Sequence, residues 1–407
     1  MDNLPKQAVM LLITSQDWGG AQLYVFELAK ELKARGESVI VVAGKNPSKS
    51  PLVMGDLLTG LYSPHDKGGM GGCTGSELSA KCLAANIPFY ELKHMSRDIN
   101  PLANVFATIE LIKLFRRLKP RVVHLNSTMM GVVGSLSATL TRVPKRIYCI
   151  GGWVFNEELP GWKKSLYVWI ERVSAKWKDV IIVVHPGDEE LAIKLKIKPQ
   201  KKLVTIPNGV DVARFESKLL TREEARLKLG ADPDATLVGT IANAYPPKNL
   251  LWYLEVCKKI HDADKRIYFV IIGDGPQFEI LKKKRAELDA ESYVMLAGRR
   301  MDAPTLYKAF DLFVLPSSKE GMSITLLEAM TAKVPIVATD VGAGKWMLRD
   351  CGIIVPPNDA VRMQTAVLDI LQNKDKQKSI TQNAYAMLLA NFEQKKLLDT
   401  TVEVINE

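Results

Sequence analysis

Residues 312–330 read LFVLPSSKEGMSITLLEAM, and this stretch indicates the fold. Its first part, LFVLP, is a short continuous apolar run, which is typical of a strand buried on both faces. Its last part, ITLLEAM, has apolar residues at helical spacing and follows Ser323, a residue type that favours helix N-caps. A strand, a turn that contains glycine, and a helix in this order predict one βα unit of a parallel sheet.

The same alternation recurs along all 407 residues, in two groups of six apolar runs. We therefore predict the α/β fold class with two Rossmann-like domains. The predicted domains are residues 1–195 and 196–385, joined near a lysine-rich and turn-rich segment, and residues 386–407 are predicted as a C-terminal helix that packs back on the first domain. The apolar runs are residues 8–14, 38–44, 87–92, 122–126, 146–152 and 180–184, then 236–242, 266–273, 293–298, 312–316, 335–340 and 351–357.

Composition places the chain among ordinary globular proteins, with 47% hydrophobic and 25% charged residues. The longest apolar-looking stretch, residues 122–140, carries His124, Asn126 and several hydroxyls, so we do not predict a membrane span. No secretory signal is predicted either. The five cysteines are scattered and form no C-x-x-C pair. This pattern favours a reducing, cytoplasmic location and argues against a disulfide framework or a zinc site.

Positive charge is distributed unevenly. Residues 1–206 hold 28 basic and 18 acidic residues, so the whole net charge of +10 lies in the first half. It is concentrated in residues 111–121 and 161–178, and the second stretch mixes tryptophans with lysines at helical spacing. Such a helix can rest on an anionic membrane surface, as in a protein held peripherally on the inner face of the cell membrane. The alternative is a helix docked on the core with a solvated basic face. No nucleic-acid partner is predicted, because no binding motif occurs.

Candidate ligand-binding residues follow the predicted strands, since ligands of open parallel sheets bind at the carboxyl ends of the strands. Glu320 and Gly321 leave the strand of the opening stretch, and the next helix presents free amide groups suited to oxygens or an anion. Ser323 is predicted to cap that helix through its side chain. Glu328 lies further along the same helix, where a carboxylate can hold two vicinal hydroxyls. The alternative is a surface acid and an acid favoured by the helix dipole.

Other predicted strands end in similar turns. Asn243 and Lys248 follow residues 236–242, and a lysine there can neutralise a phosphate. Gly19 and Gly20 follow the first strand and expose amides suited to a diphosphate. Taken singly, each turn also fits a plain connection between a strand and a helix. The two D-x-D strings, residues 232–234 and 262–264, precede strands and are predicted as turns. Residues 55–75 hold seven glycines and are predicted as a loop, either a lid or a flexible insertion.

Several segments in a fixed order together resemble family 4 glycosyltransferases of the GT-B fold. The segments are WGGAQLYVFELAKELKARGESVIVV, PNGVD, ANAYPPKN, IIGDGP, LYKAFDLFVLPS and EGMSITLLEAM followed by PIVATDVG. VVHLNS and GGWVFNE further resemble the branch that acts in bacterial surface-polysaccharide and lipid-linked saccharide assembly. The resemblance implies two Rossmann-like domains that face each other across a cleft.

The resemblance also implies an activity: transfer of a sugar, with retention, from a UDP- or GDP-linked donor to a saccharide or lipid-linked acceptor. It implies no metal and no cofactor beyond the nucleotide-sugar co-substrate. Glu320 and Lys248 would carry catalysis, mainly by stabilising charge on the leaving diphosphate. The implied donor-binding residues are Gly19, Gly20, Asn243, Lys248, Gly298, Arg299, Glu320, Gly321, Met322, Ser323, Ile324 and Glu328. The implied residues of the acceptor and sugar side are Gly151, Trp153 and Asn126.

Three positions depart from the family pattern. Gly151 stands where relatives carry a histidine, Met129 where a lysine is common, and Trp346 where a glutamate is common. These departures leave three hypotheses open. The chain is an active retaining glycosyltransferase, a binding protein that has lost turnover, or another enzyme on the same fold, such as a sugar-nucleotide epimerase or a phosphorylase.

Overall fold

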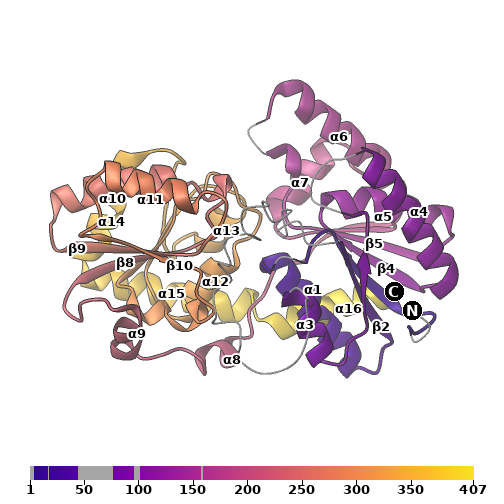
Figure 1. Ribbon diagram of the computed structural model, residues 1–407, viewed down its shortest axis with the longest axis horizontal. Coiled ribbons are helices and arrows are strands. Elements are labelled where there is room, and N and C mark those ends of the chain that lie inside the picture. The colour runs from indigo at the N-terminus through magenta and orange to yellow at the C-terminus, as the bar shows by residue number, and fades with distance from the viewer. Residues whose placement is uncertain (1–3, 17, 45–76, 96–100, 157–158) are drawn as a thin grey trace, which may run out of the picture. The chain divides into compact units, whose positions relative to one another are not determined.

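A computed structural model describes residues 4–16, 18–44, 77–95, 101–156 and 159–407. The predicted glycine-rich loop at 55–75 lies outside these residues. The chain divides into two compact units (Figure 1). The first unit is Met1–Thr205 with Thr401–Glu407, and the second unit is Ile206–Thr400.

The first unit is built on a sheet of seven parallel strands in the order β3-β2-β1-β4-β5-β6-β7. Its central strands are buried along their whole length, as continuous apolar runs predict. The chain moves outward from β1 in one direction and then returns to β4 on its other side. The strands are β1 (Val9–Ile13), β2 (Val39–Gly44), β3 (Phe89–Leu92), β4 (Val122–Asn126), β5 (Lys145–Ile150), β6 (Val180–Val183) and β7 (Lys202–Thr205).

Helices cover both faces of this sheet (Figure 1). α1 (Gly20–Ala34) and α3 (Glu77–Ala84) lie on one face. On the other face, buried residues of four helices share one hydrophobic core with the strands. These helices are α4 (Pro101–Leu118), α5 (Thr128–Leu140), α6 (Gly161–Ala175) and α7 (Pro186–Lys194).

The second unit has a six-stranded parallel sheet in the order β10-β9-β8-β11-β12-β13. The strands are β8 (Thr236–Ile241), β9 (Ile267–Ile272), β10 (Val294–Gly298), β11 (Leu312–Leu315), β12 (Ile336–Thr339) and β13 (Ile353–Val355). The longer helices are α9 (Arg222–Leu229), α10 (Leu250–Ala263), α11 (Phe278–Glu287), α12 (Ile324–Thr331), α14 (Ala360–Gln372), α15 (Lys374–Asn391) and α16 (Gln394–Asn406). The last residues of α16, from Thr401 on, belong to the first unit.

The predicted fold class is confirmed: both halves form doubly wound parallel sheets. The unit boundaries differ from the predicted domains at two places. β7 pairs with β6, so residues 196–205 belong to the first sheet. Residues 386–400 belong to the second unit, and Thr401–Glu407 belongs to the first. The first D-x-D string forms a turn as predicted, since Asp232 accepts a hydrogen bond from the Asp234 amide. The second was predicted wrongly in part, because Asp262 lies in the last turn of α10 and only Asp264 enters the turn that follows, where it accepts from the Arg266 amide.

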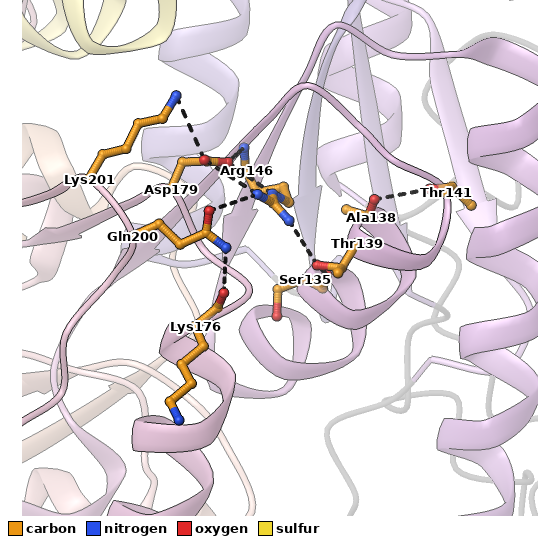
Figure 2. Close-up of polar contacts among 9 residues, drawn as sticks. All are labelled: Ser135, Ala138, Thr139, Thr141, Arg146, Lys176, Asp179, Gln200 and Lys201. Atoms are coloured by element: carbon orange, nitrogen blue, oxygen red, sulfur yellow. Dashed lines mark hydrogen bonds and ion pairs between the residues drawn. The ribbon is translucent and has the colours of Figure 1, made fainter.

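Part of the positive charge of the first unit is used to hold its sheet together. Figure 2 shows a polar network at the amino ends of β5 and β6. The Arg146 guanidinium lies 2.9 Å from Asp179 and donates to Thr139 and Gln200. Lys201 adds a second cation 3.8 Å from the same aspartate. These side chains lie at the end of the sheet opposite to the one where ligands of parallel sheets bind, so we assign them a structural role.

Candidate active site

The loops that follow β8 and β11 meet at one point of the second sheet. β8 and β11 are neighbours, yet the chain leaves β8 toward β9 on one side and leaves β11 toward β12 on the other. Such a reversal opens space beyond the carboxyl ends of the two strands, and ligands of open sheets bind there. The Ser318 amide donates to the Pro247 carbonyl at 2.9 Å, so the two loops are joined directly.

Lys248 and Glu320 form an ion pair at this point. The Lys248 Nζ atom lies 2.6 Å from Glu320 Oε1, and Ser317 Oγ donates to the same oxygen at 2.6 Å. The glutamate side chain is 11% exposed and the lysine side chain 28%. Ser317 is held in turn by Thr339, whose hydroxyl donates to its carbonyl at 2.5 Å. Both of these contacts to Glu320 fall on Oε1, so among the described residues Oε2 is the oxygen available to a ligand.

The turn at Glu320 and Gly321 is braced by a glycine from another loop. Gly342 has φ +53°, and a Cβ atom there would lie 2.3 Å from the Gly321 carbonyl oxygen. The Ala343 amide donates to that same oxygen at 2.7 Å. Both the left-handed backbone and the close approach require glycine at this position. The position of Glu320 therefore depends on residues that lie after β12.

Glu328, on α12, has a buried tyrosine as its partner. The Tyr307 hydroxyl donates to Glu328 Oε2 at 2.6 Å. The glutamate residue keeps some exposed surface, but enclosure of its carboxyl group raises the pKa from 4.5 to about 7, against the opposing effect of the Tyr307 hydrogen bond. Glu328 therefore titrates near neutral pH, which the sequence did not indicate. With Oε2 bonded to Tyr307, Oε1 is the oxygen that a ligand hydroxyl can reach.

The start of α12 corrects one prediction. Ser323 occupies the N-cap position, but its side chain makes no capping hydrogen bond and instead lies 2.9 Å from the Thr325 hydroxyl. The first-turn amides are therefore not occupied by this hydroxyl. Met322 is buried, and its sulfur and carbonyl oxygen accept hydrogen bonds from Asn208. Its side chain thus packs against the residue 207–211 loop, and only its backbone is left for the predicted contact with a sugar.

The remaining predicted donor-side residues of the second unit lie at the same edge of the sheet. Asn243 is exposed just after β8, and Arg299 is exposed just after β10. The Gly298 carbonyl accepts from the Gly273 amide at 2.9 Å, which joins the ends of β9 and β10. The structure thus brings the following residues to successive strand ends of one edge: Asn243, Lys248, Gly298, Arg299, Glu320, Gly321, Met322, Ser323 and Ile324, with Glu328 one helix turn beyond.

The first unit has an equivalent edge. Gly19 is the N-cap of α1 and Gly20 is its first residue, with extended backbone at Gly19 that does not itself require glycine. The Thr14 and Ser127 hydroxyls are hydrogen-bonded across the ends of β1 and β4. Ser127 has φ 80° and ψ 152°, a conformation that non-glycine residues rarely adopt. Strained backbone of this kind gathers at functional sites, and the sequence did not single out this serine.

Two residues predicted on the acceptor side support this edge from within. Asn126 is buried and donates to the Leu12 carbonyl at 3.1 Å. Trp153 is fully buried and donates to the Asp188 carbonyl at 3.0 Å. Since both side chains are occupied by the protein itself, we assign them positioning roles and no longer expect direct contact with an acceptor. A histidine that sequence analysis missed lies in the same region, where His185 Nε2 is 3.2 Å from Asp188.

The three departures from the family pattern have different surroundings. Gly151 is exposed, and a Cβ atom there would have no neighbour within 4 Å, so a side chain can start at this position without a clash. Met129 packs against the hydrophobic core of the first unit. Trp346 packs edge-on against Phe392, with 5.3 Å between ring centroids. Met129 and Trp346 therefore serve packing, whereas Gly151 leaves open space at the candidate site.

Comparison with known proteins identifies the family. Residues 19–209 match the family model "Glycosyl transferase 4-like domain", and residues 221–387 match "Glycosyl transferases group 1". The chain belongs to the family 4 glycosyltransferases. One relative is the UDP-Gal:alpha-D-GlcNAc-diphosphoundecaprenol alpha-1,3-galactosyltransferase of Escherichia coli. It is 28% identical to this glycosyltransferase, and the matched region covers 69% of this chain and 74% of the relative. The capsular polysaccharide biosynthesis glycosyltransferase CapM of Staphylococcus aureus is 22% identical over 71% and 77% of the two chains.

Solved structures confirm the fold of the glycosyltransferase. Anabaena Alr3699/HepE, in complex with UDP and glucose, has a TM-score of 0.78 at 16% identity and covers 98% of this chain and 100% of its own. WaaG, a glycosyltransferase involved in lipopolysaccharide biosynthesis, has a TM-score of 0.71 at 16% identity. The match covers 98% of this chain and 99% of WaaG. Within the described residues, no helix combines the length and apolar character needed to cross a bilayer.

Proposed function

We propose that this family 4 glycosyltransferase moves a sugar, with retention, from a UDP-sugar to a hydroxyl of a lipid-linked saccharide. The observation that carries the proposal is the Lys248–Glu320 ion pair at the switch point of the second sheet, with Glu328 on the adjoining helix. The Escherichia coli relative supports the choice of donor and acceptor, because its name specifies UDP-galactose and a diphosphoundecaprenol-linked sugar. GDP-sugars remain the alternative donors.

Each residue of the site has a chemical role in this proposal. The Lys248 ammonium group faces the donor diphosphate and stabilises the negative charge that develops when the bond between the anomeric carbon and the phosphate oxygen breaks. Glu320 Oε2 accepts a hydrogen bond from the transferred sugar, and Glu328 Oε1 accepts one from the ribose. The acceptor oxygen bonds to the anomeric carbon on the same face, and its proton passes to the leaving diphosphate. The step then needs no side chain as a base.

We further propose that the reaction uses no metal ion. D-x-D strings often hold a metal against a diphosphate, but the two in this chain lie just before β8 and β9, at the opposite end of the strands from Lys248. Activity that survives exhaustive chelation with EDTA is the expected result. Loss of activity that is restored by Mg²⁺ or Mn²⁺ would contradict it.

Transfer of label tests the proposed function. The purified protein would be incubated with radiolabelled UDP- and GDP-sugars and a detergent-dispersed diphosphoprenol-linked N-acetylhexosamine. We expect label in the lipid fraction with at least one UDP-sugar, and loss of this transfer in Glu320→Gln. Epimerised donor without an acceptor would instead identify the epimerase. A folded protein that transfers no sugar from the whole panel would contradict the proposal.

A second candidate function is donor binding without turnover, and the empty space at Gly151 favours it. In that case calorimetry would detect UDP-sugar binding by a protein that does not transfer. Gly151→His would then raise transfer from background, because it restores the residue that the family pattern carries at this position, and a Cβ atom there meets no neighbour within 4 Å. If the histidine variant binds donor and stays inactive, Gly151 is not the cause of the missing turnover.

We also propose that the protein is cytoplasmic and rests peripherally on the inner face of the cell membrane. The concentration of the net charge of +10 in the first half supports this location. Co-sedimentation with vesicles tests it, and absence of binding at both low and high salt would contradict it.

A further inference from the structure

α6 exposes an apolar stripe at its start. Trp162, Leu166 and Trp169 are spaced by four and three residues and therefore lie on one face of the helix. Their exposed fractions are 66%, 45% and 60%. The whole of residues 161–166 is exposed, and Figure 1 shows the helix projecting from its unit. Two large indoles on one exposed helix face point to a binding partner, because scattered single apolar residues are the usual surface pattern.

α4 carries a second stripe that sequence analysis did not single out. Leu102, Val105, Phe106 and Ile109 have helical spacing and are between 43% and 72% exposed. The opposite face of the same helix is buried in the core through Ala107 and other apolar residues. α4 is therefore apolar on two faces. The second face stays largely exposed, although the Phe106 ring lies 5.4 Å from the His94 ring, centroid to centroid.

The two stripes lie in one layer and at one edge of the first unit. α4 and α6 both pack beside α5, on the same face of the sheet (Figure 1). In a parallel βα unit the helix runs back against its strand, so its first turns lie at the carboxyl edge of the sheet. Both stripes occupy these first turns. They therefore lie near the edge that holds Ser127 and Gly151.

Basic residues accompany the stripes. Lys163 and Lys164 are exposed beside Trp162, and the Lys163 ammonium group lies 5.4 Å from the Trp162 ring centroid. Lys113 and Arg116 are exposed further along α4. No acidic residue occurs at positions 101–109 or 161–170. Positive charge next to tryptophan and aliphatic side chains matches a membrane surface with anionic headgroups.

A second copy of the chain fits this surface less well. Two copies joined through α6 would bring Lys163 and Lys164 of both chains together, and like charges repel at such an interface. α6 does not span the membrane, because its 15 residues are too few to cross a bilayer. The helix has the length, charge and apolar face of one that lies in the plane of the interface.

We infer that the first turns of α4 and α6 form one docking surface for an anionic lipid bilayer. Trp162, Leu166 and Trp169 insert between the headgroups together with the α4 stripe, while the lysines contact lipid phosphates. The carboxyl edge of the first sheet then lies at the lipid surface. If the proposed function holds, this places the acceptor-side edge where a lipid-linked saccharide emerges from the membrane. Docking itself does not depend on that function.

Co-sedimentation of the full chain with vesicles tests the inference. The vesicles contain phosphatidylcholine alone or with about one third phosphatidylglycerol. We expect binding to the anionic vesicles and a loss of about tenfold in partition coefficient for each indole removed in Trp162→Ala/Trp169→Ala. Leu102→Ala/Phe106→Ala should also weaken binding at least about tenfold. Leu227→Ala, which truncates a residue that is 83% exposed on α9, is the matched control and should bind as the wild type does.

Charge reversal separates the two parts of the surface. Lys163→Glu/Lys164→Glu should weaken binding to anionic vesicles at low salt, whereas Lys282→Glu/Lys283→Glu on α11 should not. Because the stripes are apolar, part of the wild-type binding should survive 0.5 M salt. Complete loss of vesicle binding at high salt would mean that only electrostatic attraction holds the protein, and it would contradict insertion. Unchanged binding of both Trp162→Ala/Trp169→Ala and Leu102→Ala/Phe106→Ala would also contradict insertion.

Two further measurements keep docking and catalysis distinguishable. Glu320→Gln should bind vesicles normally although it transfers no sugar, and Trp162→Ala/Trp169→Ala should still transfer to a short, water-soluble acceptor analogue. If the wild type docks but transfers nothing, only the proposed function fails. If sedimentation equilibrium shows a dimer that the tryptophan variant abolishes, the surface is an interface between copies and the inference is overturned.

Discussion

The titration of Glu328 gives the sharpest test of the donor site. A carboxylate at this position accepts hydrogen bonds from ribose hydroxyls, whereas a protonated carboxyl group accepts them poorly. With a pKa of about 7, the carboxylate fraction rises from roughly a tenth at pH 6 to roughly nine tenths at pH 8. The Kd of a nucleotide sugar should therefore be about tenfold weaker at pH 6 than at pH 8. UDP-glucose is a suitable probe, because its diphosphate diester does not titrate in this range.

Two substitutions separate Glu328 from other titrating groups. Tyr307→Phe removes the hydroxyl that donates to Glu328 Oε2, and this hydrogen bond lowers the pKa of the carboxyl group. The midpoint of the binding curve should therefore move to higher pH in this variant. Glu328→Gln cannot titrate, so its Kd should be weak and nearly independent of pH. Calorimetry at five or six pH values between 5.5 and 8.5 measures all three proteins.

Protein stability should depend on the same titration, but in the opposite direction: donor affinity rises with pH, whereas stability falls. Between pH 4.5 and about pH 7, the folded chain binds more protons at Glu328 than the unfolded chain does. The free energy of unfolding therefore falls as the pH rises through this range. The loss is about 3 kcal/mol at most. Urea unfolding of Glu328→Gln should lack this loss, so the variant gains on the wild type between pH 5 and pH 8. A wild-type Kd that is flat from pH 6 to 8, or a glutamine variant with the same slope, would refute this account of the site.

Three other substitutions test separate parts of the site. Lys248→Met should lower kcat/KM about a hundredfold or more, because the charge that stabilises the leaving diphosphate is removed, and steady-state kinetics with a UDP-sugar would measure it. Gly342→Ala should lower the free energy of unfolding by about 2 kcal/mol or more and should lower donor affinity, since its Cβ would displace the Glu320 turn. Gly36→Ala is the control for backbone strain alone, because Gly36 has φ +80° and no neighbour within 4 Å. Gly151→His should leave thermal stability nearly unchanged, because the added side chain enters open space, and differential scanning fluorimetry would check this.

The sequence predicted the fold and the location of the site because both depend on local patterns. Continuous apolar runs identify strands buried on both faces, and the carboxyl ends of parallel strands share one edge. This is sufficient to place Lys248 and Glu320 together although 72 residues separate them. The ion pair itself was not predicted, because the polar residues after two strands show no pairing until the strand order is known. The strand order β8-β11 supplies that information.

Partners that come from buried apolar segments could not be predicted. Tyr307 lies in the stretch LYKAF, where an aromatic residue indicates core packing, and its hydroxyl gives no sign of reaching α12. Ser323 shows the converse, because a residue type that favours capping is present but its hydroxyl bonds elsewhere. Residue type thus predicts the position of a side chain more reliably than the atom that it contacts. The charge state of Glu328 depends on such contacts and is visible only in the structure.

The membrane-facing surface shows why exposure limits what a sequence can reveal. In α4, Leu102, Phe106 and Ile109 have the same helical periodicity as Ala107, Leu111 and Leu114, which are buried. A helix that is apolar on two faces is usually read as fully buried. The sequence analysis therefore singled out the tryptophans and lysines of residues 161–178 and the basic residues of 111–121, but not the apolar stripe at the start of α4. In the structure this stripe is between 43% and 72% exposed, which adds an apolar component to the proposed surface and predicts that binding persists in part at high salt.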